Sequence, residues 1–326
     1  MNLASTATHE LWLDTDPGFD DWMAWLLIES LAQFHLHGVS VVAGNAPLEH
    51  TLPNALRIKA FHGFATPVYA GCDRPWAQAQ VTAQDVLGTH GMASTGRVLP
   101  ETLAPLTPGH GVQALMDCVR ARPGRVTLLA VGPLTNIATA FMLAPELPGL
   151  LKAIVIMGGS TVGGNATAAA EFNIRADPEA ASQVFNCGMP VHMFGLNLCR
   201  QIPVSNTEVA LVRAVATEQA QVFADYLDGY VDISRKRGRP FQSVYDPTPV
   251  IWLARPELFE LKPARVDIEL AGHFTRGMTV CDLRAPALAR ANALVAVAAQ
   301  GAPALAWAMA HILQRLSPPG ARHAPQ

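Results

Sequence analysis

Four carboxylates lie within eight residues near the start of the chain, in the segment DTDPGFDD at residues 14–21. The Pro17-Gly18 pair predicts a tight turn, across which Asp16 and Asp21 can face each other. Helix capping accounts for one Asp but not for four, because crowded like charges raise one another's pKa unless a cation neutralises them. No His or Cys accompanies the cluster. It therefore predicts a hard divalent cation, Ca²⁺ or Mg²⁺, rather than zinc.

Short aliphatic runs alternate with longer helical patterns over most of the chain. The runs that indicate strands are Leu11–Asp14, Val39–Ala43, Val68–Ala70, Val126–Val131, Ala153–Met157, Val191–Phe194 and Ala293–Ala298. The main helical patterns are Asp20–Gln33, His50–His62, Leu134–Leu143, Pro178–Asn186 and Glu218–Arg237, with a last helix ending at Leu316. Aliphatic runs without alternation are typical of strands covered on both faces. We expect an α/β fold with a doubly wound, mostly parallel central sheet flanked by helices.

Such sheets bind ligands outside the carboxyl ends of their strands, and polar or glycine-containing segments follow several of the runs. These segments are Asp14–Asp16, Gly44-Asn45, Gly132-Pro133, Gly158-Gly159 and Asn197. All of them fall on the same predicted edge of the sheet. That edge is where we expect the site.

The composition excludes several classes of protein. The chain has 326 residues, of which 50% are hydrophobic and 15% charged, so it can bury a large core and is not disordered. A net charge of −3 with no basic run argues against a nucleic-acid partner. The five cysteines form no CxxC pair, which favours a reducing cytosol over a disulfide scaffold.

No segment reads as a targeting or membrane sequence. The N-terminus lacks both a basic and an apolar region of a signal peptide. The apolar stretch Ala291–Ala310 is interrupted by Gln300, Gly301 and Pro303, so it indicates a strand followed by a helix. We expect a cytoplasmic protein with no membrane partner, in which one domain at 11–316 lies between flexible tails at 1–10 and 317–326.

Six sequence blocks occur in a fixed order and carry a family resemblance. They are DTDPGFDD, VAGN (42–45), VGPLTNIA (131–138), IVIMGG (154–159), EFNIRADPEAA (171–181) and YDP (245–247). With them the chain resembles the nucleoside hydrolases, the calcium-dependent N-ribohydrolases of the inosine–uridine-preferring group, from about residue 11 to 316. The resemblance implies Ca²⁺ as cofactor, a small-molecule nucleoside as substrate, and a homodimer or homotetramer.

The resemblance also implies roles for individual residues. Asp16 would be the base that activates the calcium-bound water, and it would bind the metal together with Asp21, Asp246 and the carbonyl of Val131. The expected catalytic residues are Asp16, Tyr245 and Asn173, and the expected substrate-binding residues are Asp20, Asn45, His90, Met157, Asn165, Glu171, Phe172, Asn173 and Tyr230. Cleavage of an N-glycosidic bond develops positive charge on the ribosyl ring, which carboxylate and amide oxygens stabilise.

Two positions depart from the family pattern. Tyr245 stands where many members carry a His that protonates the leaving base, and a phenol is a weaker acid than imidazolium at neutral pH. Tyr245 can donate a hydrogen bond, stack on the base or simply pack on Phe241. In the segment GLNLCRQ, Asn197 and Arg200 replace an acid and a neutral residue or His. The sequence therefore does not assign a preferred base.

Two other functions remain open on the sequence alone. The first is a nucleoside-binding relative with little turnover, because Tyr245 replaces the leaving-group acid. The second is a phosphatase of the haloacid-dehalogenase type, with Asp14 as nucleophile and Asp16 as acid. That chemistry needs a lysine after a strand, and none of Lys59, Lys152, Lys236 and Lys262 stands there.

Overall fold

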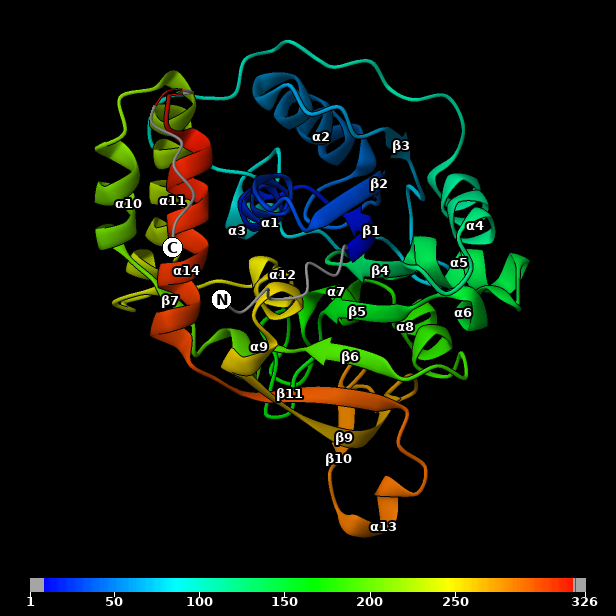
Figure 1. Ribbon diagram of the computed structural model, residues 1–326. Coiled ribbons are helices and arrows are strands. Elements are labelled where there is room, and N and C mark those ends of the chain that lie inside the picture. The colour runs from blue at the N-terminus through cyan, green and yellow to red at the C-terminus, as the bar shows by residue number, and fades with distance from the viewer. Residues whose placement is uncertain (1–8, 319, 321–326) are drawn as a thin grey trace, which may run out of the picture.

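A nine-stranded sheet is the centre of the part of the chain that the computed structural model describes, residues 9–318 and 320 (Figure 1). Its strands are β1 (His9–Thr15), β2 (Phe34–Val41), β3 (Val68–Ala70), β4 (Val126–Ala130), β5 (Ala153–Met157), β6 (Val191–Phe194), β9 (Phe259–Ile268), β10 (Thr279–Asp282) and β11 (Ala293–Ala299). Two further strands, β7 (Pro203–Val204) and β8 (Gln242–Ser243), form a separate small ladder.

The strand order is β10-β9-β11-β6-β5-β4-β1-β2-β3. Neighbours are parallel from β3 to β11, whereas β9 pairs antiparallel with both β11 and β10. The expected doubly wound, mostly parallel sheet is confirmed. β1 lies between β2 and β4, and the strand order runs outward from it in opposite directions on its two sides. The topological switch point of the sheet therefore lies between β1 and β4. Ligands bind at such a point.

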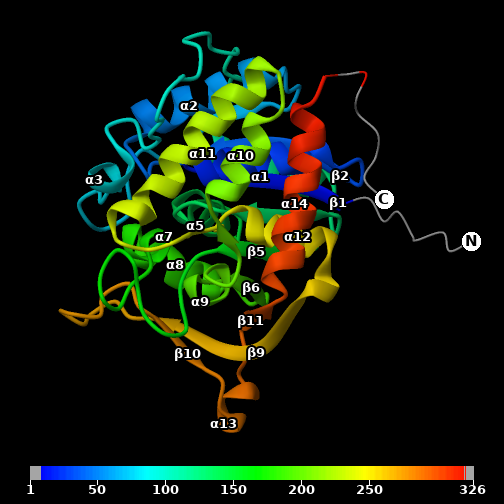
Figure 2. The same ribbon diagram turned by 90° about the vertical axis from the view of Figure 1, so that its left-hand side faces the viewer.

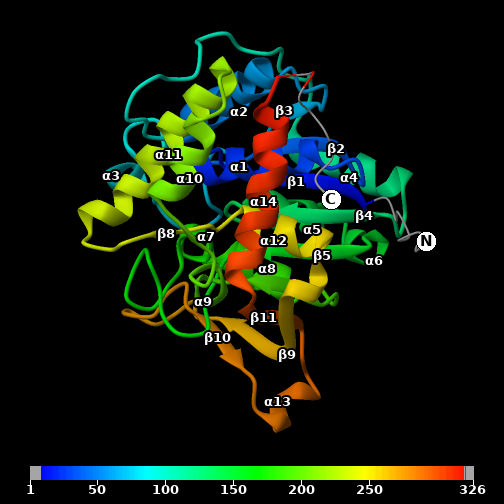
Figure 3. The ribbon, with the colours of Figure 1, turned by 60° about the vertical axis from the view of Figure 1, so that its left-hand side comes forward.

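Helices cover both faces of the sheet (Figures 1 and 2). One face carries α1 (Phe19–Ser30), α2 (Leu48–His62), α11 (Glu218–Lys236), α12 (Pro247–Ala254) and α14 (Gly301–Leu316), and the other carries α4 (Gly111–Ala121), α5 (Thr135–Leu143) and α8 (Pro178–Phe185). Figure 3 shows α14 running beside α11 and α12. The remaining helices are α3 (Gln84–Leu87), α6 (Leu147–Leu150), α7 (Phe172–Ala176), α9 (Leu196–Cys199), α10 (Asn206–Arg213), α13 (Ala285–Leu288) and a 3₁₀ turn at Pro256–Leu258.

The packing of α1 fixes the start of that helix, where two of the acidic residues lie. Trp22 is fully buried and its ring contacts the rings of Phe223 and Tyr226 on α11. Its indole N–H donates a hydrogen bond of 2.9 Å to Nε2 of His62 at the end of α2. A buried indole is held in place by such a bond as well as by its area. The neighbouring Asp20 and Asp21 are therefore carried on a rigid turn.

The β9–β10 hairpin at one edge of the sheet was not predicted. β9 has the sequence FELKPARVDI, in which exposed polar residues and Pro263 interrupt the apolar ones. A strand whose residues alternate between buried and exposed does not give the continuous aliphatic run of a strand covered on both faces. Between β3 and Pro108, where no helix was predicted, the chain contains the short helix α3.

The apolar stretch near the C-terminus consists of strand β11 and helix α14, as predicted. Among the described residues, no helix has both the length and the apolarity that a membrane span requires. All five cysteines are free thiols. The expected tails at 1–10 and 317–326 fall mostly outside the described residues, although His9 and Glu10 belong to β1.

Candidate active site

A cavity of about 410 Å³ opens at the carboxyl ends of β1, β4 and β5. Its wall includes Asp16, Asp20, Asn45, Val131, Met157, Asn165, Glu171, Phe172, Asn173, Tyr230, Tyr245 and Asp246. The volume is in the range of sites that enclose a small molecule. The cavity therefore brings together twelve of the residues that sequence analysis selected, at the predicted edge of the sheet.

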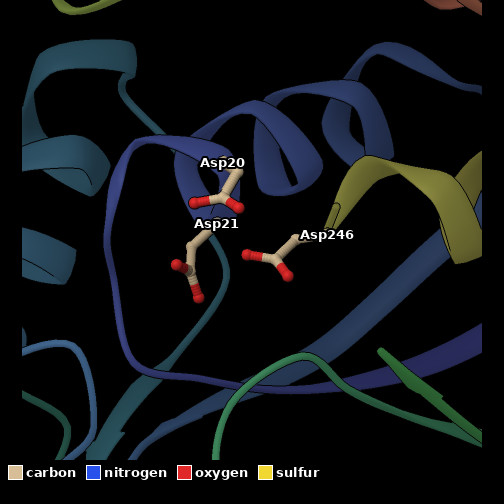
Figure 4. A group of neighbouring side chains, drawn as sticks. All are labelled: Asp20, Asp21 and Asp246. Carbon is tan, nitrogen blue, oxygen red and sulfur yellow. The ribbon is translucent and has the colours of Figure 1, made fainter. Parts of the chain in front are cut away.

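Three carboxylates from two distant parts of the chain meet at the base of this cavity. Carboxylate oxygens of Asp20, Asp21 and Asp246 all lie within 4.8 Å of one another. Figure 4 shows Asp20 and Asp21 on the first turn of α1 and Asp246 facing them from the start of α12. Asp21 does not line the cavity, because it turns back to accept hydrogen bonds from the Thr15 hydroxyl and from the N–H of Gly18 at 2.8 Å.

Asp16 adds a fourth carboxylate at the end of β1 and is almost completely buried. Its Oδ2 accepts a hydrogen bond of 2.7 Å from the backbone N–H of Asn45. The Asn45 amide donates in turn to the Asp16 carbonyl at 3.0 Å and to Oδ2 of Asp21 at 3.3 Å. The segment after β2 therefore fixes how the Asp16 carboxylate is presented to the cavity.

The four carboxylates are unfavourable as anions without a partner charge. Burial and the charge of Asp21 raise the pKa of Asp16 well above its ordinary value, and the same two causes raise the pKa of Asp20 to about 7. Burial and the charges of Asp20 and Asp21 raise the pKa of Asp246 well above its ordinary value. No lysine is among the residues that line the cavity. A set of oxygen ligands with this charge fits a hard divalent cation such as Ca²⁺.

The opposite wall of the cavity is an interlocked set of polar side chains around α7. The Asn173 amide donates to the carbonyl of Val131 at 2.7 Å and to that of Met157 at 3.1 Å. Glu171 accepts hydrogen bonds from the N–H of Gly159 at 2.9 Å and from that of Asn173 at 3.0 Å. These contacts link the ends of β4 and β5 to α7. They hold a carboxylate and an amide in fixed positions against whatever occupies the cavity.

Tyr245 and Tyr230 form the side of the cavity that lies next to Asp20. The Tyr230 hydroxyl lies 2.8 Å from the Ser243 carbonyl and 3.1 Å from Oδ2 of Asp20. Tyr245 is half-buried in the cavity wall, and its burial raises the pKa of the phenol. Phe241, the alternative packing partner considered for Tyr245, is 42% exposed.

Two residues from the sequence analysis lie away from this arrangement. His90 does not line the cavity; its Nδ1 is 3.3 Å from Nδ1 of His50. Trp76, an aromatic residue that could have formed a lid over the cavity, does not line it and donates its indole hydrogen to the Thr139 hydroxyl. Sequence reasoning did not find the segment 81–87, Gln242 or Arg239, which also line the cavity. Arg239 could have been found from the short segment RKRGR at 235–239, which spans the end of the predicted helix.

The phosphatase alternative fails on the position of Asp14. This residue is completely buried and lies outside the cavity wall. Its Oδ2 accepts hydrogen bonds from the Ser40 hydroxyl and from the Asn136 amide at 2.8 Å, and burial raises its pKa to about 7. A nucleophile must reach its substrate, which Asp14 cannot do in this position.

Comparison with known proteins gives a consistent result over most of the chain. Residues 11–304 match the model of the inosine-uridine preferring nucleoside hydrolase family. The pyrimidine-specific ribonucleoside hydrolase RihA of Shewanella woodyi is 39% identical over 291 residues, which is 88% of this chain and 93% of that protein. The inosine-uridine preferring nucleoside hydrolase of Leishmania major is 36% identical, over 87% of this chain and 91% of that one.

Solved structures agree with the sequence relatives. The purine-preferring ribonucleoside hydrolase from Gardnerella vaginalis superimposes with a TM-score of 0.87 at 28% identity, covering 94% of this chain and 99% of that one. A plant nucleoside hydrolase superimposes with a TM-score of 0.86 at 25% identity, over 95% of this chain and 99% of that one. The similarity therefore covers the whole sheet and both helix layers.

Proposed function

Because the chain belongs to the inosine-uridine preferring nucleoside hydrolase family and is a ribonucleoside hydrolase, we propose that Asp16, Asp21, Asp246 and the Val131 carbonyl hold Ca²⁺ in its active site. The convergence of four carboxylates, three of them buried, at the base of one cavity carries this proposal. A bound Ca²⁺ would lower the pKa of a water molecule and orient the ribose hydroxyls. Asp20 lies in the same acidic group and would bind the ribose hydroxyls.

The chain's own residues account for the rest of the reaction. Asp16 accepts a proton from water as the water oxygen bonds to C1′ of the ribose. The N-glycosidic bond breaks, and its electron pair leaves with the base nitrogen. Asn165, Glu171 and Asn173 supply oxygens that stabilise the positive charge developing on the ribosyl ring. The hydrogen bonds around α7 keep these groups in place before substrate binds, so that little reorganisation is needed.

The preferred base of the nucleoside substrate is the remaining question. The relatives are named for pyrimidine-specific, inosine-uridine preferring and purine-preferring activities, so we propose a ribonucleoside and test the base directly. Uridine, cytidine, inosine and guanosine are compared by the release of ribose and of free base. We expect equimolar release from at least one of them. Tight binding of these nucleosides without release would instead support the binding-only alternative.

Replacing Tyr245 with His is expected to increase turnover of nucleosides with poor leaving groups, by up to about 10²-fold near pH 6. An imidazolium is a stronger acid than a phenol whose pKa is raised by burial. Inosine hydrolysis is measured together with hydrolysis of p-nitrophenyl riboside, whose leaving group needs no proton. The gain should be confined to inosine. Tyr245→Phe, which keeps the ring, serves as the matched control, and an equal gain with both substrates would argue against a role in protonation.

Adding one methyl group at Gly44 is expected to reduce kcat by about 10²-fold, because it displaces the catalytic base. A Cβ on this residue would collide with Oδ2 of Asp16 and lie 2.7 Å from Cδ of Pro133. Ribose release and the melting temperature are measured for Gly44→Ala. The control is Gly149→Ala on α6, where a Cβ has open space. Activity of Gly44→Ala within threefold of wild type would mean that Asp16 need not be held where it lies.

We also propose that the enzyme is a cytosolic homodimer or homotetramer with its catalytic domain at 11–316. The family resemblance supports the assembly, and the five free thiols support a reducing compartment. Light scattering of the purified protein tests the assembly against the chain mass of 34.8 kDa. A mass equal to one chain would contradict it.

A further inference from the structure

The mouth of the substrate cavity carries positive charge, in contrast to its acidic base. Arg200, Arg237 and Arg239 all line the cavity and all three are exposed, against a single exposed carboxylate, that of Asp85, in the same lining. The carboxylates that would bind the cation and the ribose are buried at the other end. A nucleoside placed with its ribose on the carboxylates would direct its base toward the arginines. The three guanidinium groups are therefore placed to meet the base.

The end of α11 explains how two of these arginines reach the cavity. The helix ends at Lys236, and Gly238 follows with a φ of 68°, a left-handed conformation that favours glycine. The N–H of Arg239 donates to the Ser234 carbonyl at 2.9 Å, which anchors the turn. The chain then runs through β8 to Tyr245. Arg237 and Arg239 thus lie on either side of a glycine that turns the chain back over the cavity.

These three arginines form no ion pair with a carboxylate in the described part of the protein. On the outer side of α11, Arg235 pairs with Asp228 at 2.9 Å and Lys236 with Asp232 at 2.8 Å. Arg237 and Arg239 form no ion pair or side-chain hydrogen bond in the described chain, and Arg200 makes only a long contact of 3.4 Å to the Gly164 carbonyl.

We propose that Arg200, Arg237 and Arg239 select nucleosides whose base carries a negative charge, such as a carboxylate. Guanidinium groups form charge-assisted, often bidentate hydrogen bonds with carboxylates. Three unpaired guanidinium groups around one ligand also raise its local concentration before it docks. This inference rests on the proposed function, since it assumes that the ribose occupies the acidic end. It makes the arginines specificity-determining residues of the same active site.

The experiment compares two nucleosides that differ in charge and are nearly equal in shape, 5-carboxyuridine and 5-carbamoyluridine. We expect wild type to prefer the carboxylate by about tenfold or more in kcat/KM at low ionic strength, with a smaller preference in high salt. In the triple variant R200Q/R237Q/R239Q the preference should fall to about the value set by the different reactivities of the two bases as leaving groups. Arg290 is exposed on the β10–β11 connection and does not line the cavity. The control variant R290Q should therefore keep the wild-type ratio of the two kcat/KM values.

Three outcomes would overturn the inference. Equal kcat/KM for the two nucleosides in wild type would show that charge is not recognised. An unchanged preference in R200Q/R237Q/R239Q would assign it to other residues. A preference for uridine 5′-monophosphate over uridine that the triple variant abolishes would place the anion on the ribose side instead. The neutral 5-carbamoyluridine separates this inference from the proposed function. Its hydrolysis without a preference for the carboxylate would overturn only the inference, whereas no ribose release from any nucleoside would contradict the proposed function.

Discussion

Asp16→Asn is expected to lower kcat for ribose release by about 10³-fold or more, because an amide cannot accept the proton of the attacking water. The substitution keeps the size of the side chain and an oxygen that can accept the N–H of Asn45. The fold should therefore be retained. Ribose release is measured at saturating Ca²⁺, so that a weaker cation site does not limit the rate, and the melting temperature is measured in parallel.

The control for Asp16 is Asp117→Asn, which removes a carboxylate from the outer surface of α4. It alters the net charge equally and should leave kcat within about twofold of wild type, as expected for a surface substitution. Hydrolysis by Asp16→Asn within tenfold of wild type, in a folded protein, would remove Asp16 from the role of base. Asp20 would then be the next candidate, since it lines the same cavity.

Asp246→Asn is expected to have opposite effects on stability with and without Ca²⁺. In chelator at pH 8 the variant should melt at a higher temperature than wild type. Burial and the charges of Asp20 and Asp21 raise the pKa of Asp246, so this carboxyl group costs folding stability at a pH above its unfolded-state pKa, and a neutral amide removes that cost. With Ca²⁺ the order should reverse. A cation at 100 times its Kd stabilises the folded state by about 2.7 kcal/mol, which wild type gains and the variant largely loses.

Thermal melts of both proteins across a Ca²⁺ titration measure this crossing. Mg²⁺ and Na⁺ at matched ionic strength separate a specific site from screening. Asp282→Asn serves as the matched control, since Asp282 pairs with Arg284 on the far edge of the sheet and should show the wild-type response. Curves for wild type and Asp246→Asn that rise in parallel with Ca²⁺ would show that the cation binds elsewhere.

The central part of the fold could be predicted because its signals are local. Strands β3, β5 and β6 have the predicted bounds. The clearest signal is that of β5, whose sequence AIVIM is a continuous and almost fully buried aliphatic run. The acidic turn after β1 could be placed at the sheet edge for the same reason. Once the strands are known to be parallel, every segment that follows a carboxyl end falls on one edge, including those that carry Asn45 and Asn173.

The rest of the site depends on long-range packing that no local pattern encodes. The spacing in the chain does not show that segment 81–87 lies over the cavity, or that the turn at Gly238 carries Arg239 to its mouth. Asp246 is 225 positions beyond Asp21, and only the family resemblance joined them. The β9–β10 hairpin was missed because β9 is half exposed and lacks a continuous apolar run. Sequence therefore predicted the acidic end of the cavity better than the end lined by the arginines.

The dependence of ribose release on Ca²⁺ tests the central claim most directly. Purified protein is treated with a chelator, passed into metal-free buffer, and assayed on the best nucleoside of the panel before and after Ca²⁺ is added back. The account predicts a loss of about 10²-fold or more without the cation, recovery with Ca²⁺, and no recovery in Asp246→Asn at the same Ca²⁺ concentration. Full activity in the metal-free protein, with bound calcium absent by elemental analysis, would contradict it.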